Sequence, residues 1–288
     1  MGVIEAGAKP VKLAEGFAFT EGCTSDASGN VFFVDQPQSQ ILKWTFDGEE
    51  VRGKFSGGKL STFLEPSGHS NGMSFDGAGN LIACADLHNE VWSIAPDKRV
   101  KVLVRGYEGK LLNGPNDVWV RPDGGLYLSD PLYPRDWWKG LREPTVQVGG
   151  EFVFYVDART GEVRPVVTDL VKPNGIIGTP DGKTLYVSDI RGKRTWRYRM
   201  EADGSLSDKR LFCEEESDGM TMDEAGNVYV TNKGVSIYSP QGQRLERVDM
   251  PAWVGNTCFG GADMRTLFMA ASKEIYALRM TLRGVGPA

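Results

Sequence analysis

The hydrophobic residues of this chain fall into short runs separated by polar turn residues, and the pattern recurs along the whole sequence. In each recurrence an apolar run meets a glycine-centred polar turn and then a second run, such as Val31–Val34 or Leu126–Leu128. Short runs joined by a glycine turn predict β-hairpins. Further alternating stretches, each a candidate strand, follow the hairpins at residues 40–46, 90–96, 151–157, 194–200, 235–240 and 274–280.

The hairpins belong to six repeats, and the first position of each repeat is polar. We call this position the polar slot; it holds Glu21, Asn71, Asn116, Asn174, Asp218 and Asn256. Eight residues after the slot, five repeats carry a glycine and the last carries Met264. Successive slots lie 38 to 58 residues apart, close to the length of a four-stranded propeller blade.

The repeats therefore predict an all-β chain folded as a six-bladed β-propeller, with residues 1–288 forming a single domain. In such a ring, residues 10–15 ("PVKLAE") are expected to supply the outer strand of the last blade. The 36 glycines and 15 prolines among 288 residues agree with a fold rich in turns.

Charge and hydropathy exclude two classes of partner. The net charge of -5 gives no broad positive field, so we expect no nucleic-acid binding. No apolar run approaches the roughly 20 residues that span a bilayer, so we expect no membrane insertion. The first ten residues lack the apolar core of a secretory signal, which predicts a cytoplasmic protein, or a periplasmic one if a leader has been removed.

The few cysteines and histidines limit the chemistry further. The four cysteines are widely spaced without a C-x-x-C pair, so neither a zinc knuckle nor a dense disulfide framework is indicated. Only two histidines occur, which excludes a three-histidine metal site. Cys23 and Cys258 lie two places after their slots, where other repeats have apolar residues. We therefore expect both thiols in the core.

The segment G-H-S-N-G around Ser70 matches the G-x-S-x-G pattern of a serine-hydrolase elbow. An elbow serine stands between a strand and a helix. Here the sequence after Ser70 predicts a strand and a hairpin turn, and only His69 and His88 could act as its base. We interpret the segment as part of the repeat.

The six slots together point to a metal site. In a propeller the inner strands run along the central channel, so equivalent positions face the axis at one depth. Carboxylate and amide oxygens suit a hard cation such as calcium, and two carboxylates would balance a divalent charge. The alternative is that Asn-Gly and Asp-Gly pairs only make turns where the inner strands begin.

Four segments carry a resemblance to a known family. They are "TEGCTSDASGNVFFVD", "LNGPNDVWVRPDGGLYLSDP", "VKPNGIIGTPDGKTLYVSD" and "SDGMTMDEAGNVYV". In this order they closely resemble the SMP-30/gluconolactonase/luciferin-regenerating-enzyme family over essentially the whole chain. The resemblance implies a six-bladed propeller with a divalent cation in its central channel. We expect the cation to be calcium, with magnesium, manganese or zinc as alternatives. Many members hydrolyse sugar lactones.

The resemblance also implies roles for individual residues. Its metal ligands match Glu21, Asn116, Asn174 and Asp218, and Asp218 matches the general base or nucleophile. A water activated by Asp117 is an alternative catalytic route. Asn71 and Asn256 would line the channel and, with Asn116 and Asp117, bind substrate. The chain departs from the family's animal lactonases at Gly114, where those enzymes carry an arginine that contacts substrate.

The long connection over residues 131–150 is expected to be a lid or binding loop. Trp137 and Trp138 could stack on a sugar ring or form a dimer contact, and His69 and Lys172 lie within two residues of a slot. We include His69 and Trp137 among the substrate-binding residues. Lys172 also fits an ordinary surface position.

The functional prediction is a metal-dependent hydrolase that opens a sugar lactone, acting as a monomer or homodimer on a small-molecule substrate. Two alternatives stay open: another ester or phosphotriester hydrolase on the same site, and a non-catalytic propeller that binds a ligand.

Overall fold

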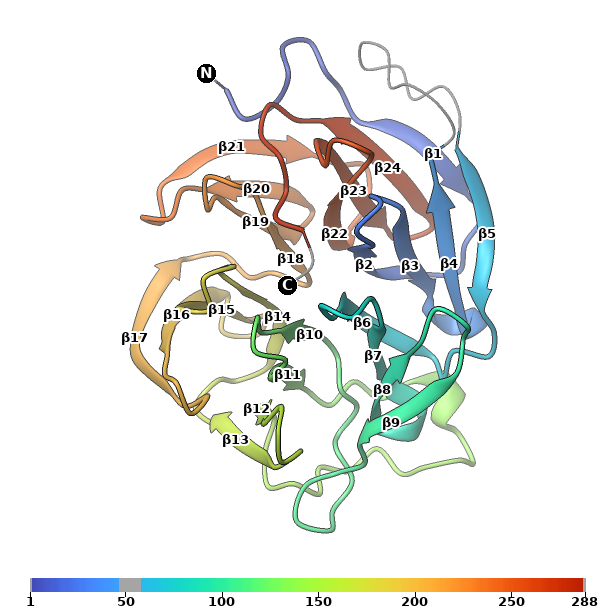
Figure 1. Cartoon of the computed structure of the whole chain (residues 1–288), viewed down its shortest axis with the longest axis vertical. Helices are drawn as coiled ribbons and strands as arrows, with labels where there is room; N and C mark the ends of the chain where they lie inside the picture. Colours follow the sequence, from blue (N-terminus) through green and yellow to red (C-terminus); the bar gives the residue numbers. More distant parts are fainter. Residues whose placement is uncertain (1, 47–57, 287–288) are drawn as a thin grey trace. The chain divides into compact units, whose positions relative to one another are not determined.

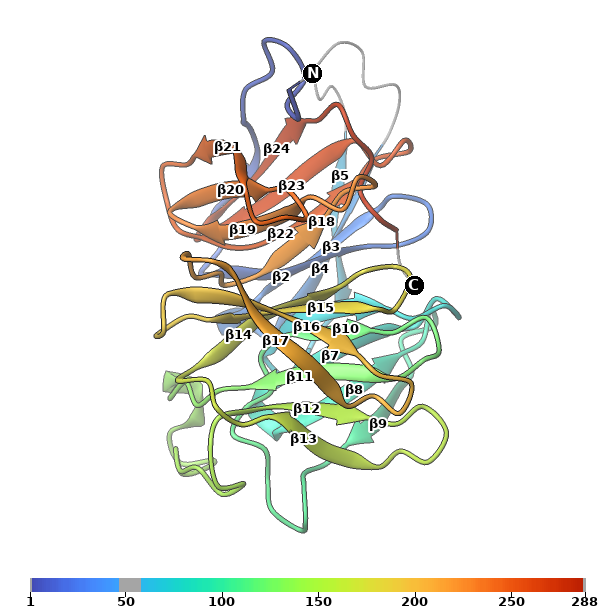
Figure 2. The same ribbon diagram turned by 90° about the vertical axis from the view of Figure 1, so that its left-hand side faces the viewer.

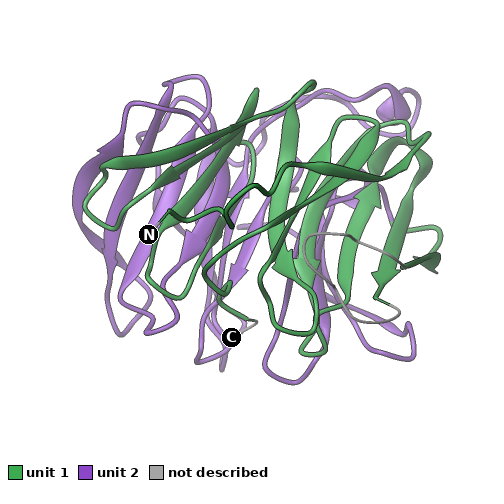
Figure 3. Cartoon of the chain, turned by 90° about the horizontal axis from the view of Figure 1, so that it is seen from above, with its two compact units in different colours: residues 1–67, 218–287 green, residues 68–217, 288 purple. Residues whose placement is uncertain are grey.

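The computed structural model describes residues 2–46 and 58–286, and the ordered elements of this part are almost all β-strands. Within it, 24 strands form six four-stranded antiparallel sheets. The prediction of an all-β, six-bladed β-propeller is confirmed (Figure 1). The chain divides into two compact units, Met1–Ser67 with Asp218–Pro287, and Gly68–Ser217 (Figure 3). A single domain over residues 1–288 stays a prediction.

The first unit contains three blades. Blade 1 is β2 (Thr20–Ser25), β3 (Val31–Asp35), β4 (Gln40–Thr45) and β5 (Lys59–Leu64). Blade 5 is β18 (Met220–Met222), β19 (Val228–Asn232), β20 (Gly234–Tyr238) and β21 (Arg244–Asp249). Blade 6 is β22 (Val254–Gly260), β23 (Thr266–Ala271), β24 (Glu274–Arg279) and β1 (Val11–Glu15). The N-terminal strand β1 therefore completes blade 6, as residues 10–15 predict.

The second unit contains the other three blades. Blade 2 is β6 (Ser70–Phe75), β7 (Leu81–Ala85), β8 (Glu90–Ile94) and β9 (Val100–Val104). Blade 3 is β10 (Val118–Val120), β11 (Leu126–Asp130), β12 (Phe152–Val156) and β13 (Val163–Val167). Blade 4 is β14 (Pro173–Gly178), β15 (Thr184–Asp189), β16 (Arg194–Met200) and β17 (Leu206–Cys213) (Figure 2).

Helices are short in the described part of the chain. They are three single-turn 3-10 helices, η1 (Gln36–Gln38), η2 (Asp86–His88) and η3 (Asp136–Trp138). None of the helices among these residues has the length and hydropathy needed to cross a bilayer.

The turn that follows each polar slot explains the recurring glycine. All five glycines eight residues after the slots have φ between 67° and 87°, a left-handed conformation that glycine adopts without steric cost. Met264, the exception in the sequence, has φ 56° and takes the same conformation. The repeat therefore conserves a backbone geometry even where it does not conserve the residue.

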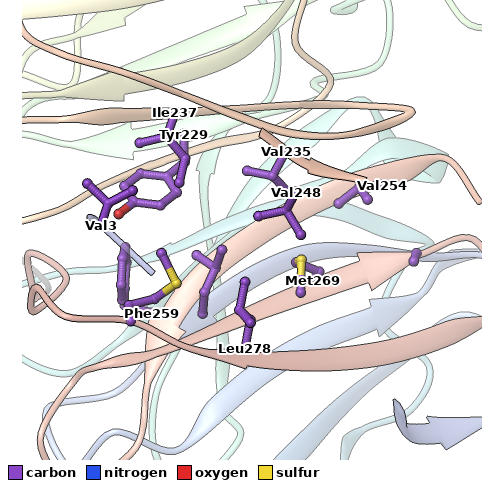
Figure 4. Packing of buried hydrophobic residues seen from close by; sticks show 12 residues of the cluster. Val3, Tyr229, Val235, Ile237, Val248, Val254, Phe259, Met269 and Leu278 are labelled. Carbon is purple, nitrogen blue, oxygen red and sulfur yellow. The ribbon is translucent and has the colours of Figure 1, made fainter. Parts of the chain in front are cut away.

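Side chains packed between neighbouring sheets form the core of each unit. Between blades 5 and 6, the rings of Tyr229 and Phe259 meet edge to face with centroids 5.2 Å apart (Figure 4). Between blades 6 and 1, Cys23 and Cys258 join a cluster with Phe33 and Phe268, which confirms that both thiols are core residues. Each fully buried aromatic side chain contributes about 1.5–3 kcal/mol to folding.

Candidate active site

In the first unit, the polar slots are at or near the first positions of the innermost strands. Glu21 lies in β2, Asn256 lies in β22, and Asp218 precedes β18. Glu21 and Asn256 are buried, and Asp218 is half-buried. The three inner strands are neighbours, because β22 contacts both β2 and β18. Their polar slots thus lie on adjacent inner strands of one unit.

Two glycines next to the slots let these side chains approach one another. A β-carbon at Gly255 would stand 2.4 Å from Oε1 of Glu21, and one at Gly219 would stand 2.3 Å from Cγ of Asn256. Neither distance is compatible with a side chain. Glu21 therefore lies directly against the residue before Asn256, and Asn256 lies against the residue after Asp218.

The second unit repeats this arrangement with Asn71 in β6, Asn116 before β10 and Asn174 in β14. A β-carbon at Gly72 would stand 2.2 Å from Oδ1 of Asp117. All four polar side chains, those of Asn71, Asn116, Asp117 and Asn174, are buried. The second unit therefore gathers one carboxylate and three amides at the ends of its inner strands.

Hydrogen bonds fix Asp117 between blades 3 and 4. Its Oδ1 accepts the backbone N–H of Val118 at 3.0 Å, and its Oδ2 accepts that of Ile176 at 3.2 Å. The carboxylate is therefore held in one orientation beside Asn116. Its predicted catalytic role stays a prediction.

The alternative that Asn-Gly pairs serve only as turns is wrong for the second unit. Asn71-Gly72 and Asn174-Gly175 lie within strands β6 and β14. Neither glycine has the positive φ of a glycine turn. Gly72 is needed for the close approach of Asp117.

Gly72→Ala is expected to lower both stability and activity. The added β-carbon would also stand 2.5 Å from the Cα of Asp117, so the backbone at Asp117 or at residue 72 has to shift to make room for it. Such overpacking costs about 1–3 kcal/mol of unfolding free energy, and the displaced Asp117 should lower kcat/KM. Urea unfolding and a lactone assay measure the two effects. Gly2→Ala, whose β-carbon would lie 3.8 Å from its nearest neighbour, is the control; equal values for the two variants would contradict the packing explanation.

A tryptophan that lies outside the repeat orients Asp218. Nε1 of Trp253 donates a hydrogen bond to Oδ2 of Asp218 at 2.6 Å. Trp253 stands in the connection before β22, three residues before the slot Asn256. The repeat in the sequence gives no signal for Trp253, because no periodic pattern marks a residue in a connection.

The connection over residues 131–150 is fastened to all three blades of the second unit. At blade 4, Nδ2 of Asn174 donates to the hydroxyl of Tyr133 at 3.0 Å, and Nζ of Lys172 donates to the carbonyl of Leu132 at 2.7 Å. At blade 3, the N–H of Leu132 donates to Glu151 at 2.9 Å. Lys172 is buried and pairs with Glu151 at 2.8 Å, so the surface interpretation of this lysine is wrong.

At blade 2 the same connection is held by the buried carboxylate of Asp86. Its Oδ2 accepts the indole N–H groups of Trp137 at 3.1 Å and Trp138 at 2.9 Å. Arg142 donates to the carbonyls of Asp86 and Asn113. With these bonds the connection is a fixed strap; we call residues 131–142 the strap from here on.

The strap changes the predicted roles of the two tryptophans. Trp138 is 2% exposed and the guanidinium carbon of Arg142 stands 3.3 Å from its ring centroid, so Trp138 cannot stack on a sugar. Trp137 stacks face to face on His69, with centroids 4.8 Å apart and planes at 5°. The structure therefore brings together the two predicted substrate-binding residues His69 and Trp137, with at least one face of each ring occupied by the other.

The same network explains why position 114 is a glycine. Gly114 has φ 147°, and a β-carbon there would stand 2.5 Å from Oδ1 of Asp86 and 3.2 Å from Nη2 of Arg142. An arginine at this position would collide with the anchor of the strap. The departure from the family's animal lactonases thus follows from the local packing.

Asp130, at the end of β11, is fully buried. It accepts the backbone N–H groups of Asn113 and Gly114, each at 2.9 Å. Burial raises the pKa of Asp130 from 3.8 to about 7, although these hydrogen bonds and the charge of Arg142 act in the opposite direction. The side chain therefore takes up a proton on folding at mildly acidic pH.

This proton uptake predicts a pH-dependent stability. Because the folded pKa lies above the unfolded one, the contribution of Asp130 is fully present below pH 4 and is lost as the pH rises through about 7. The shift in the pKa of Asp130 corresponds to roughly 4 kcal/mol across that window. Urea unfolding at several pH values should give a flatter profile for Asp130→Asn than for the parent chain; parallel profiles would contradict the assignment.

Ser70 does not form a nucleophile elbow. It opens strand β6 and is fully buried, and the chain continues through the strand into the next hairpin. His88 stacks on Trp92 with centroids 5.3 Å apart. The prediction that G-H-S-N-G belongs to the repeat is confirmed.

The residues at the slots suit a hard cation. In the described ranges, no group of three or more histidine, cysteine, aspartate or glutamate side chains gathers as a metal site. The slots instead offer two carboxylates and four amides. The buried amides of Asn71 and Asn116 make no side-chain hydrogen bond among residues 2–46 and 58–286, which is unusual for buried polar groups and leaves their oxygens for a ligand.

One known protein family matches this chain over most of its length. The profile of the SMP-30/gluconolactonase/LRE-like region covers residues 19–273. The chain belongs to this family. A relative named gluconolactonase, from Zymomonas mobilis subsp. mobilis, is 28% identical and aligns with 93% of this chain and 80% of its own. A 6-deoxy-6-sulfogluconolactonase of Pseudomonas putida is 30% identical over 55% of this chain and 54% of its own.

Solved structures of the SMP-30/gluconolactonase type share the fold. A structural-genomics target provisionally described as a gluconolactonase superposes with a TM-score of 0.87 and 33% identity, covering 98% of this chain and 96% of its own. A gluconolactonase of Xanthomonas campestris superposes with a TM-score of 0.83 and 24% identity, covering 96% and 91% of the two chains.

Proposed function

We propose that this chain is a lactonase that hydrolyses the ester bond of a sugar lactone at a divalent cation. The ligands we assign to the cation are Glu21, Asn116, Asn174 and Asp218. The observation that carries the proposal is that six repeats place an oxygen-bearing side chain at one equivalent position.

Calcium is the cation we propose, since it accepts six to eight oxygen ligands and tolerates amides among them. The two carboxylates of Glu21 and Asp218 would balance its charge. When bound, such an ion polarises an ester carbonyl and stabilises the negative charge that develops on its oxygen. Magnesium, manganese and zinc are the alternatives for the test.

Asp218 is the residue we assign to the proton transfer. Trp253 holds one of its oxygens at 2.6 Å, so the carboxylate points in a fixed direction. Asp218 takes a proton from the attacking water as the new C–O bond forms, and the proton passes to the ring oxygen as the lactone C–O bond breaks. A hydroxy acid is the product, and no protein nucleophile is required.

Asp117 and the slot amides are assigned to substrate binding. Backbone N–H groups fix the carboxylate of Asp117, so it can accept hydrogen bonds from sugar hydroxyl groups at defined positions. Asn71 and Asn256 are assigned the same task. The stacked rings of His69 and Trp137, with His69 two residues before Asn71, are assigned to contact the sugar. We infer an aldonolactone as the substrate, since relatives carry the names gluconolactonase, 6-deoxy-6-sulfogluconolactonase and pentonolactonase.

A pH-stat assay tests the proposal directly. Gluconolactone is added to the chain in the presence of calcium, and acid release is compared with spontaneous hydrolysis in the same buffer. Release well above the spontaneous rate supports the lactonase. Release at the spontaneous rate with calcium, magnesium, manganese and zinc in turn would contradict it, and a phosphotriester assay would then test the other hydrolase.

A further inference from the structure

Arg135 is a half-buried cation of the strap that lies against two aromatic rings. Its guanidinium carbon stands 5.2 Å from the centroid of Tyr133 and 5.6 Å from that of Trp137. Its Nε is buried without a hydrogen-bond partner. In the part of the chain that the structure describes, its guanidinium pairs with no carboxylate within 4.0 Å.

The neighbouring cations of the second unit are placed differently. Lys172 pairs with Glu151 and donates to a backbone carbonyl. Arg142 donates to two backbone carbonyls and covers Trp138. Both of these side chains have acceptors within the protein. Arg135 has aromatic faces to lie on. Its Nε is buried, and its two terminal Nη groups are the donors left for a partner from solution.

The carboxylate of Asp86, which feels the charge of Arg135, already accepts other hydrogen bonds. Burial raises the pKa of Asp86, and the charge of Arg135 offsets part of that rise. The Asp86 oxygen that faces the strap accepts two indole N–H groups. Arg135 thus acts on Asp86 through space without a hydrogen bond to it.

The two aromatic rings that support Arg135 are each held in place by a hydrogen bond. Tyr133, one of its two supporting rings, accepts a hydrogen bond from the slot residue Asn174. Trp137, the other ring, is held by Asp86 and stacks on His69. The guanidinium is therefore oriented in advance beside residues assigned to substrate binding, and little conformational entropy is lost when it binds.

A guanidinium held between aromatic rings, without a carboxylate partner, favours an oxyanion as its ligand. It is planar and permanently charged, and its paired N–H donors match the two oxygens of a carboxylate, phosphate or sulfonate. We propose that Arg135 is a specificity-determining residue that binds an oxyanion group of the reactant. The group is either a substituent on the lactone or the carboxylate that ring opening creates. This proposal rests on the proposed lactonase function.

Arg135→Gln tests the proposal with two lactones that share a ring. The substrates are neutral gluconolactone and its 6-phosphate ester, and the inhibitor is gluconate. A charge-assisted hydrogen bond contributes roughly 1.5–3 kcal/mol, so its loss raises a KM or inhibition constant about 10- to 100-fold. A rise in KM for the phosphorylated lactone alone identifies a substituent on the substrate. A rise in the gluconate inhibition constant alone identifies the product carboxylate.

Controls separate binding from loss of structure. Arg135→Lys keeps the charge and should recover part of the affinity, although it loses the paired donors. Arg194→Gln removes an exposed arginine of β16 in the same unit and should change neither constant. A melting temperature of Arg135→Gln within about 1 °C of the parent would show that the strap is intact. Unchanged constants for all three ligands in such an intact variant would overturn the proposal.

Failure of the lactonase function would give a different pattern. In that case the parent chain opens neither lactone, and gluconate binding measured by calorimetry replaces the kinetic test. Gluconate that binds the parent at least about tenfold more tightly than Arg135→Gln still supports the oxyanion subsite. Equal affinities would overturn it independently of any activity.

Discussion

Asp218→Asn is expected to lower kcat/KM for gluconolactone by about 10²- to 10⁴-fold, the range that a positioned general base contributes. Asparagine keeps the shape and the bond to Trp253, but it cannot take a proton and it removes one charge from the proposed ligand set. The measurement is initial rates in the pH-stat at saturating calcium. Trp253→Phe, which leaves Asp218 but removes its orienting N–H, should fall between the parent and Asp218→Asn.

The control for this series is Asp249→Asn. Asp249 lies at the end of β21 with a side chain 91% exposed, and it pairs with Arg247 on the surface. Its replacement should leave kcat/KM unchanged. If Asp218→Asn kept the parent's kcat/KM while its unfolding curve matched the parent's, Asp218 would have no part in the chemistry.

Removing divalent cations is expected to abolish turnover and to lower the melting temperature. In the proposed ligand set, the carboxylates of Glu21 and Asp218 would repel each other without a cation. A ligand present at 100 times its Kd stabilises the folded state by about 2.7 kcal/mol. For a chain of this size that corresponds to several degrees. The chain is dialysed against a chelator, assayed, and assayed again after calcium, magnesium, manganese or zinc is added back.

The expected result is a loss of activity that one cation restores together with the melting temperature. Glu21→Gln is the matched variant, because it removes a proposed ligand and leaves Asp218 in place. This variant should need a higher calcium concentration for half-maximal activity. Full activity of the chelated chain at the parent's melting temperature would contradict a catalytic cation.

Features that repeat along the sequence could be predicted, because each blade uses the same local geometry. The slots, the hairpins and the left-handed turn residues recur at fixed offsets, and Met264 keeps the left-handed conformation without a glycine. The assignment of residues 10–15 to the last blade also follows from the repeat, because five blades have their four strands in sequence and the sixth lacks one.

The strap could not be predicted in the same way. Tyr133 and Trp253 lie outside the repeated positions, and Asp86 ends its hairpin as Asp35, Asp130 and Asp189 end theirs. The partners of Asp86, Tyr133 and Trp253 are 51, 41 and 35 residues away in sequence. No spacing rule relates such residues. The surface interpretation of Lys172 is wrong for this reason, since its buried pairing with Glu151 depends on where the strap folds. The two tryptophans could be identified as a pair, but the burial of Trp138 beneath Arg142 depends on long-range contacts.

The most direct test of the central claim is a crystal of the chain grown with calcium and examined for anomalous scattering. The proposal predicts one strong peak within about 2.3–2.6 Å of side-chain oxygens of Glu21, Asn116, Asn174 and Asp218. A calcium peak bound by other residues, or these four side chains lying too far apart to share one ion, would contradict it.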